Sequence, residues 1–181
     1  MEQKFLCDDS VAIACVYFNH KENFTPVDIL GSLIKHLVQR RARVPEEIHH
    51  LYNRHLQRET RPTFTELSEQ LKTESRKFST VFIVLDALDE CSESQQTRAK
   101  VLSILRELQT LRLIVTGRPH ILDMTQTFEE AVRLDIRARD SDIEKYIDGQ
   151  IEMETNLKKY KQDDNLRKTI KDTIVSKANG M

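Results

Sequence analysis

Three short runs of apolar residues, many of them β-branched, alternate along the chain with longer stretches in which apolar residues recur at helical spacing. The runs are Val11–Phe18, Val81–Leu85 and Leu111–Val115, and Ala131–Ile136 is a weaker fourth candidate. Each of the first three is almost continuously apolar, a pattern typical of strands buried on both faces of a parallel sheet. We therefore expect an α/β fold in which helices flank parallel strands.

The stretches between these runs carry helix-start signals. Thr25-Pro26, Val44–Glu47 and the capping box Thr63–Glu66 each predict a helix between the first and second strands. The middle helix has a stripe formed by Ile48, Leu51, Tyr52 and Leu56. Further helices are predicted over Ser94–Gln109, from the capping box Ser141–Glu144, and over the stripe Leu166, Ile170, Ile174 and Ala178.

A change of pattern near Arg139-Asp140 separates the strand-bearing part from a purely helical tail. The sequence thus predicts an α/β core over residues 1–138 and the start of a helical subdomain over 139–181. His49, His50 and His55 lack the i, i+4 spacing of two metal ligands on one helical face, which favours a solvated surface helix.

Composition narrows the class of protein further. Of the 181 residues, 28 are Lys or Arg and 29 are Asp or Glu, so the formal charge of −1 provides no basic field for nucleic acid. The longest apolar run, Val11–Phe18, is far too short to span a membrane, and no secretory signal precedes it. Three cysteines without a CxxC pair predict neither a disulfide scaffold nor a zinc site. A cytoplasmic domain is expected.

The second apolar run ends in acidic residues. Asp86 follows Leu85 directly, and Asp89 and Glu90 come three and four positions later. Ligands of open α/β sheets bind at the carboxyl ends of the strands. There an acid can hold Mg²⁺, and a neighbouring carboxylate can orient an attacking water. The alternative is a strand followed by a polar loop that merely contains acids.

The third run ends in Thr116-Gly117-Arg118-Pro119. An arginine at this edge can reach a terminal phosphate, and Thr116 can hydrogen-bond a water. Taken alone, the four residues are more typical of a turn. The interpretation as part of a site is strengthened because these residues lie one helix after Leu85, as a crossover between parallel strands requires.

Several blocks in this order resemble a known family. They are Val81–Cys91, Leu113–Pro119, Arg133–Ile136 and Asp142–Ile147, with Val11–His20 and Ile29–Val38 before them. Together they resemble NACHT-type P-loop NTPases of the STAND class, above all the fungal nephrocystin-like N-terminal domains. In relatives these domains precede ankyrin or WD40 repeats. The resemblance implies a nucleotide-controlled switch that uses ATP or ADP with Mg²⁺ and drives oligomerisation.

The resemblance also assigns roles to residues. It implies that Asp86 is the Mg²⁺-coordinating Walker B acid and that Asp89 and Glu90 position water. Arg118 would sense the γ-phosphate with Thr116 beside it. Gly117 departs from the serine expected between these two residues.

The phosphate-binding motif G-x-x-x-x-G-K-[ST] is absent, because none of the four glycines is followed by lysine. The family pattern places its strand between the Walker B and sensor strands. Without it, Val81–Leu85 and Leu111–Val115 must pair directly or leave open edges, which invite association. We expect a fragment of the switch module that is non-catalytic and holds no cofactor by itself, with protein partners or self-association. The alternative is a residual Mg²⁺–nucleotide site completed by another chain.

Overall fold

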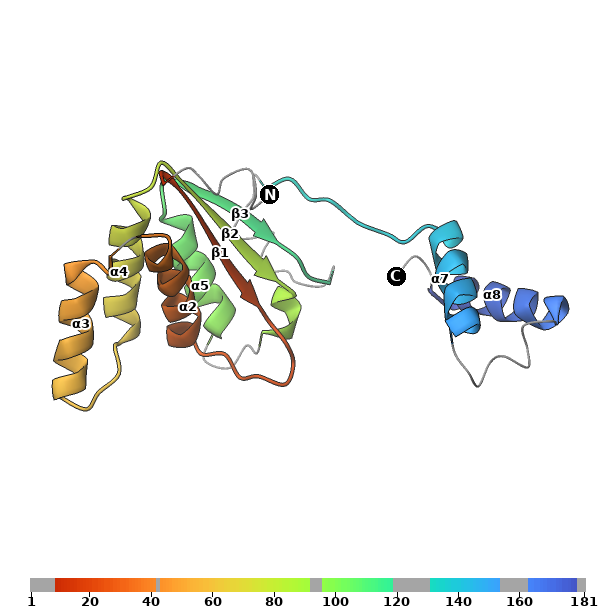
Figure 1. Cartoon of the computed structure of the whole chain (residues 1–181), viewed down its shortest axis with the longest axis horizontal. Coiled ribbons are helices and arrows are strands. Elements are labelled where there is room, and N and C mark those ends of the chain that lie inside the picture. Colours follow the sequence, from red (N-terminus) through yellow and green to blue (C-terminus); the bar gives the residue numbers. More distant parts are fainter. Residues whose placement is uncertain (1–8, 42, 92–95, 119–130, 154–162, 179–181) are drawn as a thin grey trace. The chain divides into compact units, whose positions relative to one another are not determined.

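The computed structural model describes residues 9–41, 43–91, 96–118, 131–153 and 163–178. Contacts divide the chain into two compact units, Met1–Ala131 and Val132–Met181. In chain order the elements are β1 (Val11–Tyr17), α2 (Pro26–Gln39), α3 (Glu46–Gln57), α4 (Phe64–Ser75), β2 (Thr80–Asp86), the short 3₁₀ helix η1 (Leu88–Glu90), α5 (Thr97–Arg106), β3 (Leu111–Val115), α7 (Asp140–Met153) and α8 (Asp164–Ala178). Figure 1 labels the strands and the α-helices along the ribbon.

The first unit is built on a three-stranded parallel sheet with the order β1-β2-β3. β2 is central, with Ala14 opposite Ile83 on one side and Leu113 opposite Ile83 on the other. The three apolar runs therefore form the strands that their pattern predicts. β2 pairs directly with β3, which is the first of the two arrangements expected for a chain without a strand between them.

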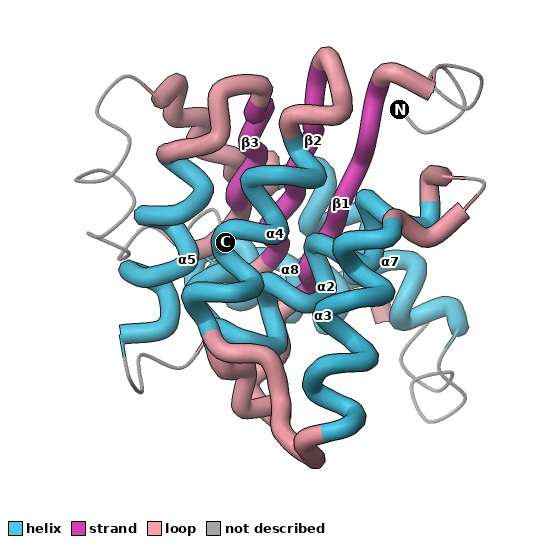
Figure 2. The backbone as a smooth tube through the Cα atoms, turned by 90° about the vertical axis from the view of Figure 1, so that its left-hand side faces the viewer, coloured by secondary structure: helices cyan, strands magenta, loops and turns pink. Residues whose placement is uncertain are grey.

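Helices α2, α4 and α5 cover one face of this sheet, and Figure 2 views the strands through them. Alternate strand residues such as Ala14, Ile83 and Leu85 are fully buried against this layer. From α2, Leu30, Leu33 and Leu37 enter the same core; α4 contributes Leu71, and α5 contributes Leu102 and Leu105. The mixed α/β class is thus confirmed.

Two of the predicted helix starts have capping boxes: Thr63–Glu66, as predicted, and Thr25–Asp28, where the sequence predicted an N-cap followed by proline. The Thr25 side chain accepts a hydrogen bond from the Asp28 amide, and the Asp28 side chain accepts one from the Thr25 amide. Thr63 and Glu66 do the same at the start of α4. These pairs satisfy amides that a helix leaves without internal partners.

Helix α3 lies outside α4 and is attached differently (Figure 1). None of its residues is buried, and Tyr52 and Leu56 are each 61% exposed. Only Ile48 and Leu51 of the predicted stripe pack against the core cluster. The stripe was therefore predicted too wide, because two of its four members face solvent.

The fourth strand candidate is wrong. Residues 131–139 form neither strand nor helix, and Val132 and Ile136 are 97% and 86% exposed. The alternation of apolar and polar residues matches a strand, but no described strand pairs with this segment to satisfy its backbone. The contact division between Ala131 and Val132 also lies a few residues before the predicted boundary at 138/139, whose domain assignment stays a prediction.

The second unit contains α7 and α8, which pack on each other. Ile147 and Ile151 of α7 are buried, whereas α8 has no buried residue. Helix α7 begins at Asp140, one residue before the predicted cap at Ser141. The predicted start of α5 at Ser94 lies outside the described residues. Within the described chain, no helix combines the length and apolarity that crossing a membrane requires.

Candidate functional site

The acidic segment after β2 forms a tight turn at the carboxyl edge of the sheet. Ala87 adopts a left-handed conformation, with φ 54° and ψ 47°. For a residue with a Cβ atom this conformation costs about 1–2 kcal/mol. Two hydrogen bonds to Thr116 hold the turn: the Ala87 amide donates to Thr116 Oγ1 at 2.9 Å, and the Leu88 amide donates to the Thr116 carbonyl at 2.9 Å. The side chain of Leu88 is buried and anchors η1 in the core.

Asp86 and Thr116 are brought together by this turn. The Thr116 hydroxyl donates a hydrogen bond to Asp86 Oδ1. The backbone joins the same strand ends, because the Phe18 amide donates to the Asp86 carbonyl at 3.0 Å and the Thr116 amide to the Leu85 carbonyl at 2.9 Å. Asp86 is thus fixed between β1 and β3 rather than projecting from a loose loop.

Asp89 and Arg118 form a second pair at this edge. The Arg118 amide donates to Asp89 Oδ1 at 3.3 Å, and its Nε lies 3.4 Å from Asp89 Oδ2. Both carboxylate oxygens of Asp89 therefore face the same arginine. The Asp89 side chain is 16% exposed and that of Arg118 is 77% exposed.

Glu90 binds a residue that the sequence pattern did not indicate. Its Oε2 accepts a hydrogen bond from the His20 amide at 3.0 Å and lies 3.6 Å from His20 Nδ1. His20 follows β1 and is 70 positions from Glu90 in the sequence. Only the parallel pairing of β1 with β2 brings these two loops to the same edge. No local sequence signal could have identified His20.

The predicted site residues Asp86, Asp89, Glu90, Thr116 and Arg118 thus share one edge of the sheet. Their carboxylates do not converge, however, because each is bound by a different partner. Among the described residues, no group of three or more His, Cys, Asp or Glu side chains is arranged to hold a metal ion. The described side chains thus form no protein cage for Mg²⁺, an ion that takes much of its shell from water and substrate phosphates.

The hollow beside the start of α2 contains none of these five residues. It has a volume of about 380 Å³ and is lined by Thr25, Pro26, Val27, Asp28, Arg61, Pro62, Phe64 and Lys100. The pKa of Asp28 is lowered first by the hydrogen bond from the Thr25 side chain, then by the Thr25 amide, with a smaller contribution from the charge of Arg61. The acid in this hollow is therefore already used as a helix cap.

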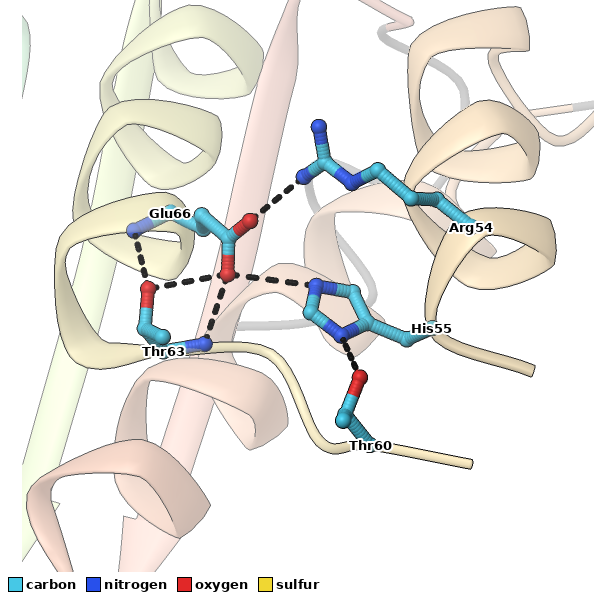
Figure 3. Close-up of polar contacts among 5 residues, drawn as sticks. All are labelled: Arg54, His55, Thr60, Thr63 and Glu66. Carbon is cyan, nitrogen blue, oxygen red and sulfur yellow. Dashed lines mark hydrogen bonds and ion pairs between the residues drawn. The ribbon is translucent and has the colours of Figure 1, made fainter. Parts of the chain in front are cut away.

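A second polar cluster joins α3 to α4 (Figure 3). Glu66 accepts hydrogen bonds from the amide and hydroxyl of Thr63, each at 2.8 Å, and from Arg54 Nη2 at 2.5 Å. His55 places Nε2 3.1 Å from Glu66 and Nδ1 2.8 Å from Thr60 Oγ1. The pKa of Glu66 is lowered to about 2, chiefly by the hydrogen bond from the Thr63 amide.

The side chain of His55 is only 12% exposed, because its contacts with Glu66 and Thr60 partly cover it, although α3 is the predicted surface helix with no buried residue. His49 and His50 are exposed, as predicted. Glu66 and its partners come from two helices and cap one of them, which makes this cluster a structural clasp.

The comparison with protein families gives one match. The sequence model of the family described as Nephrocystin 3, N-terminal, matches residues 2–118, which run from before β1 to Arg118 and include the whole carboxyl edge described above. The searches of curated proteins and of solved structures gave no significant match. The matched region covers well over half of the 181 residues and includes all three strands, so this chain belongs to the nephrocystin 3 N-terminal family.

Proposed function

We propose that this chain is a module of the NACHT/STAND type that is non-catalytic by itself and acts as a protein-interaction or regulatory domain in the cytoplasm. One observation carries the proposal: Asp86, Asp89 and Glu90 are bound by Thr116, Arg118 and His20 of the same chain. Acidic side chains with such partners stabilise the positions of the strand ends and loops, which is a structural role.

The chemistry of phosphoryl transfer supports this conclusion. Such enzymes act mainly by positioning the phosphates and stabilising their charge, and backbone amides with a lysine usually form the cradle. The sequence contains no G-x-x-x-x-G-K-[ST]. At the carboxyl edge, the Nε of Arg118 faces Asp89, which offsets part of the positive charge that a phosphate would need.

A residual Mg²⁺–nucleotide site is the second candidate, and one observation favours it. Asp86 and Arg118 lie on the same edge, and the Arg118 side chain is 77% exposed. If a second chain supplied the phosphate-binding loop, Asp86 and Arg118 would already lie on the edge of the sheet where the nucleotide would bind. The proposed interaction role and this site therefore make opposite predictions for nucleotide binding.

Calorimetric titration of the chain with ATP and ADP, with and without Mg²⁺, tests the proposal. We expect no Mg²⁺-dependent heat of binding and no release of phosphate from ATP. The same titrations on Asp86→Asn and on Asp172→Asn provide the comparison, because Asp172 is an exposed acid of α8, outside the family region. Mg²⁺-dependent binding that is lost in Asp86→Asn and kept in Asp172→Asn would overturn the non-catalytic proposal.

A further inference from the structure

The hollow beside the start of α2 is built from three segments that lie far apart in the sequence. Thr25–Asp28 belong to the start of α2, Arg61, Pro62 and Phe64 to the start of α4, and Lys100 to the first turn of α5. Its volume of about 380 Å³ falls within the range of about 300–1,000 Å³ that ligand pockets occupy. The hollow exists only because the fold brings the first turns of these three helices together.

The walls of the hollow are apolar and rigid. Pro26 is buried, and Val27, Pro62 and Phe64 are half-buried. Val27 and Phe64 also pack against the core cluster, which holds their side chains from behind. A proline ring fixes the backbone angle φ, and a preorganised wall loses little entropy when a ligand binds. The hollow can therefore accept an apolar group without rearranging.

Two cations stand at the rim of the hollow. Arg61 and Lys100 are exposed, and neither side chain has a hydrogen bond or an ion pair within the part of the chain that the structure describes. The single acid, Asp28, directs Oδ2 at Thr25, whose amide and hydroxyl donate to it at 3.0 Å and 2.6 Å. With two cations and one anion, the lining carries a net charge of +1. Its free charges are both positive.

The ends of the helices do not form an anion site of their own. In α2 and in α4 a capping box already occupies the amide at the third helical position, through the side chains of Thr25 and Thr63. Capping satisfies amides that would otherwise be open to an anion. An anionic group in the hollow would therefore be recognised by the side chains of Arg61 and Lys100.

We propose that the hollow binds an acidic segment of a partner protein, in which one apolar side chain enters between the two prolines and flanking carboxylates face Arg61 and Lys100. Complementarity in charge selects this partner, because the two free cations repel a basic segment. A free phosphate would leave the apolar walls uncovered, and Asp28 in the same lining would oppose its dense negative charge. An acidic segment with an apolar residue matches both parts of the hollow.

Binding at this hollow should be weak, because its rim is solvated. Ion pairs between exposed side chains contribute little to affinity and are screened by salt. The single apolar side chain that enters the hollow adds to them. We expect a dissociation constant of about 0.1–1 mM at low ionic strength, and a clear loss of affinity when salt is raised to about 1 M.

Fluorescence anisotropy of three labelled peptides titrated with the full chain tests the proposal. The first peptide carries one leucine between pairs of glutamates. The second has lysines in place of the glutamates, and the third has serine in place of the leucine. The first should bind, the second should not, and the third should bind more weakly than the first.

Variants of the two cations locate the binding. Lys100→Glu and Arg61→Glu should each weaken binding of the first peptide by about fivefold or more, because each sets a like charge against its glutamates. Lys35→Glu is the matched control, since Lys35 is an exposed lysine of α2 outside the hollow and its reversal should leave binding nearly unchanged. Circular dichroism of each variant reports whether it is folded.

Two further measurements separate the proposed contact from loss of folding. The double variant Arg61→Glu with Lys100→Glu should bind the lysine peptide more tightly than the wild-type chain does, a gain that unfolding cannot produce. The chain contains no tryptophan, so Phe64→Trp places a single reporter in the wall of the hollow. Its emission should shift when the glutamate peptide binds. Tyr52→Trp, at an exposed position of α3, should show no shift.

The inference rests on the interaction role proposed above and names the chemistry of its partner, and the two can fail separately. The acidic partner would be overturned by no binding of the glutamate peptide up to about 5 mM, by equal binding of the lysine peptide, or by equal losses in Lys35→Glu and Lys100→Glu. Displacement of the peptide by inorganic phosphate at equal concentration would assign the hollow to free anions and would overturn it as well.

The calorimetric test of nucleotide binding is independent of these results. Mg²⁺-dependent ATP binding that is lost in Asp86→Asn would overturn the non-catalytic proposal. It would leave the peptide site intact, because Asp86 does not line the hollow.

Discussion

Glu66 Oε2 lies 3.1 Å from Nε2 of His55, so a single carboxylate both caps α4 and attaches α3 to it. Helix α3 has no buried residue, which means that apolar packing holds it only through partly buried side chains. The polar clasp drawn in Figure 3 therefore contributes more to holding α3 in place than polar contacts contribute to a helix that is packed through buried apolar residues.

The first prediction concerns acid stability. The pKa of Glu66 falls from 4.5 to about 2 on folding, mainly through the hydrogen bond from the Thr63 amide. A lowered pKa stabilises the fold above the unfolded value, and this contribution is lost as pH falls from about 4.5 towards 2. Glu66→Gln should flatten the decrease in unfolding free energy over this interval. Urea denaturation at a series of pH values measures it.

Glu69→Gln is the control for this experiment, because Glu69 lies on the same helix and its side chain is 69% exposed. It should keep the acid dependence of the wild-type chain. An equally steep acid dependence in Glu66→Gln would show that the clasp does not lower the pKa of Glu66 as described.

The second prediction concerns the turn between Asp86 and Thr116. Thr116→Val removes the hydroxyl that donates to Asp86 Oδ1 and accepts from the Ala87 amide. The left-handed Ala87 then loses one of its two restraints. We expect a loss of about 1 kcal/mol in unfolding free energy. Thr116→Ser keeps the hydroxyl and should retain most of the stability, so equal losses in both variants would point to the methyl group instead.

The third prediction concerns a buried carboxylate. Glu74 is 0% exposed, and its Oε1 accepts hydrogen bonds from Lys77 Nζ at 2.7 Å and Gln70 Nε2 at 3.0 Å. Its Oε2 has no hydrogen-bond partner in the part of the chain that the structure describes. Lys77→Met leaves this charge without its cation and should cost about 3 kcal/mol by urea denaturation.

The double variant Lys77→Met with Glu74→Leu tests the cause of that loss. Replacing both members of a buried ion pair by apolar residues is often close to neutral. The double variant should therefore recover much of the stability that the single variant loses. No recovery would attribute the loss to packing around Lys77 rather than to an uncompensated charge.

The fourth prediction concerns the second unit. Asp148 of α7 accepts hydrogen bonds from Lys171 Nζ at 2.6 Å and from Arg167 Nη2 at 2.8 Å, both on α8. The bond from Lys171, followed by that from Arg167, lowers the pKa of Asp148. This contribution is present above the ordinary pKa of Asp and is lost as pH falls below it. Asp148→Asn should raise the rate of amide hydrogen exchange in α8 at neutral pH, whereas Asp172→Asn should not.

Local signals in the sequence predicted most of the first unit. A capping box and a Thr-Pro pair are local signals, so Thr63 and Thr25 could be assigned as helix caps without knowledge of the fold. The strands were recognisable because a parallel strand is apolar on both faces. Alternation alone was not enough, as Val132 and Ile136 show: a strand also needs a neighbour, and the local pattern does not supply one.

The candidate site could be predicted only as a set of residues at one edge. Which partner each acid takes depends on distant parts of the chain. Glu90 binds His20, which arrives from the end of β1, and Asp89 binds the arginine that had been expected to sense a phosphate. The predicted apolar stripe of α3 was too wide for a similar reason, because the position of α4 determines which side of α3 is covered.

The parallel sheet also determines how the first unit would resist a pulling force. Val11 begins β1 at one edge of the sheet, and Val115 ends β3 at the opposite edge. Tension applied between these two exits runs along the strands and loads the hydrogen bonds on both sides of β2 in shear. In shear the bonds must break together, whereas bonds pulled across the strands open one after another. The sheet is thus strongest in the direction along which its own chain enters and leaves.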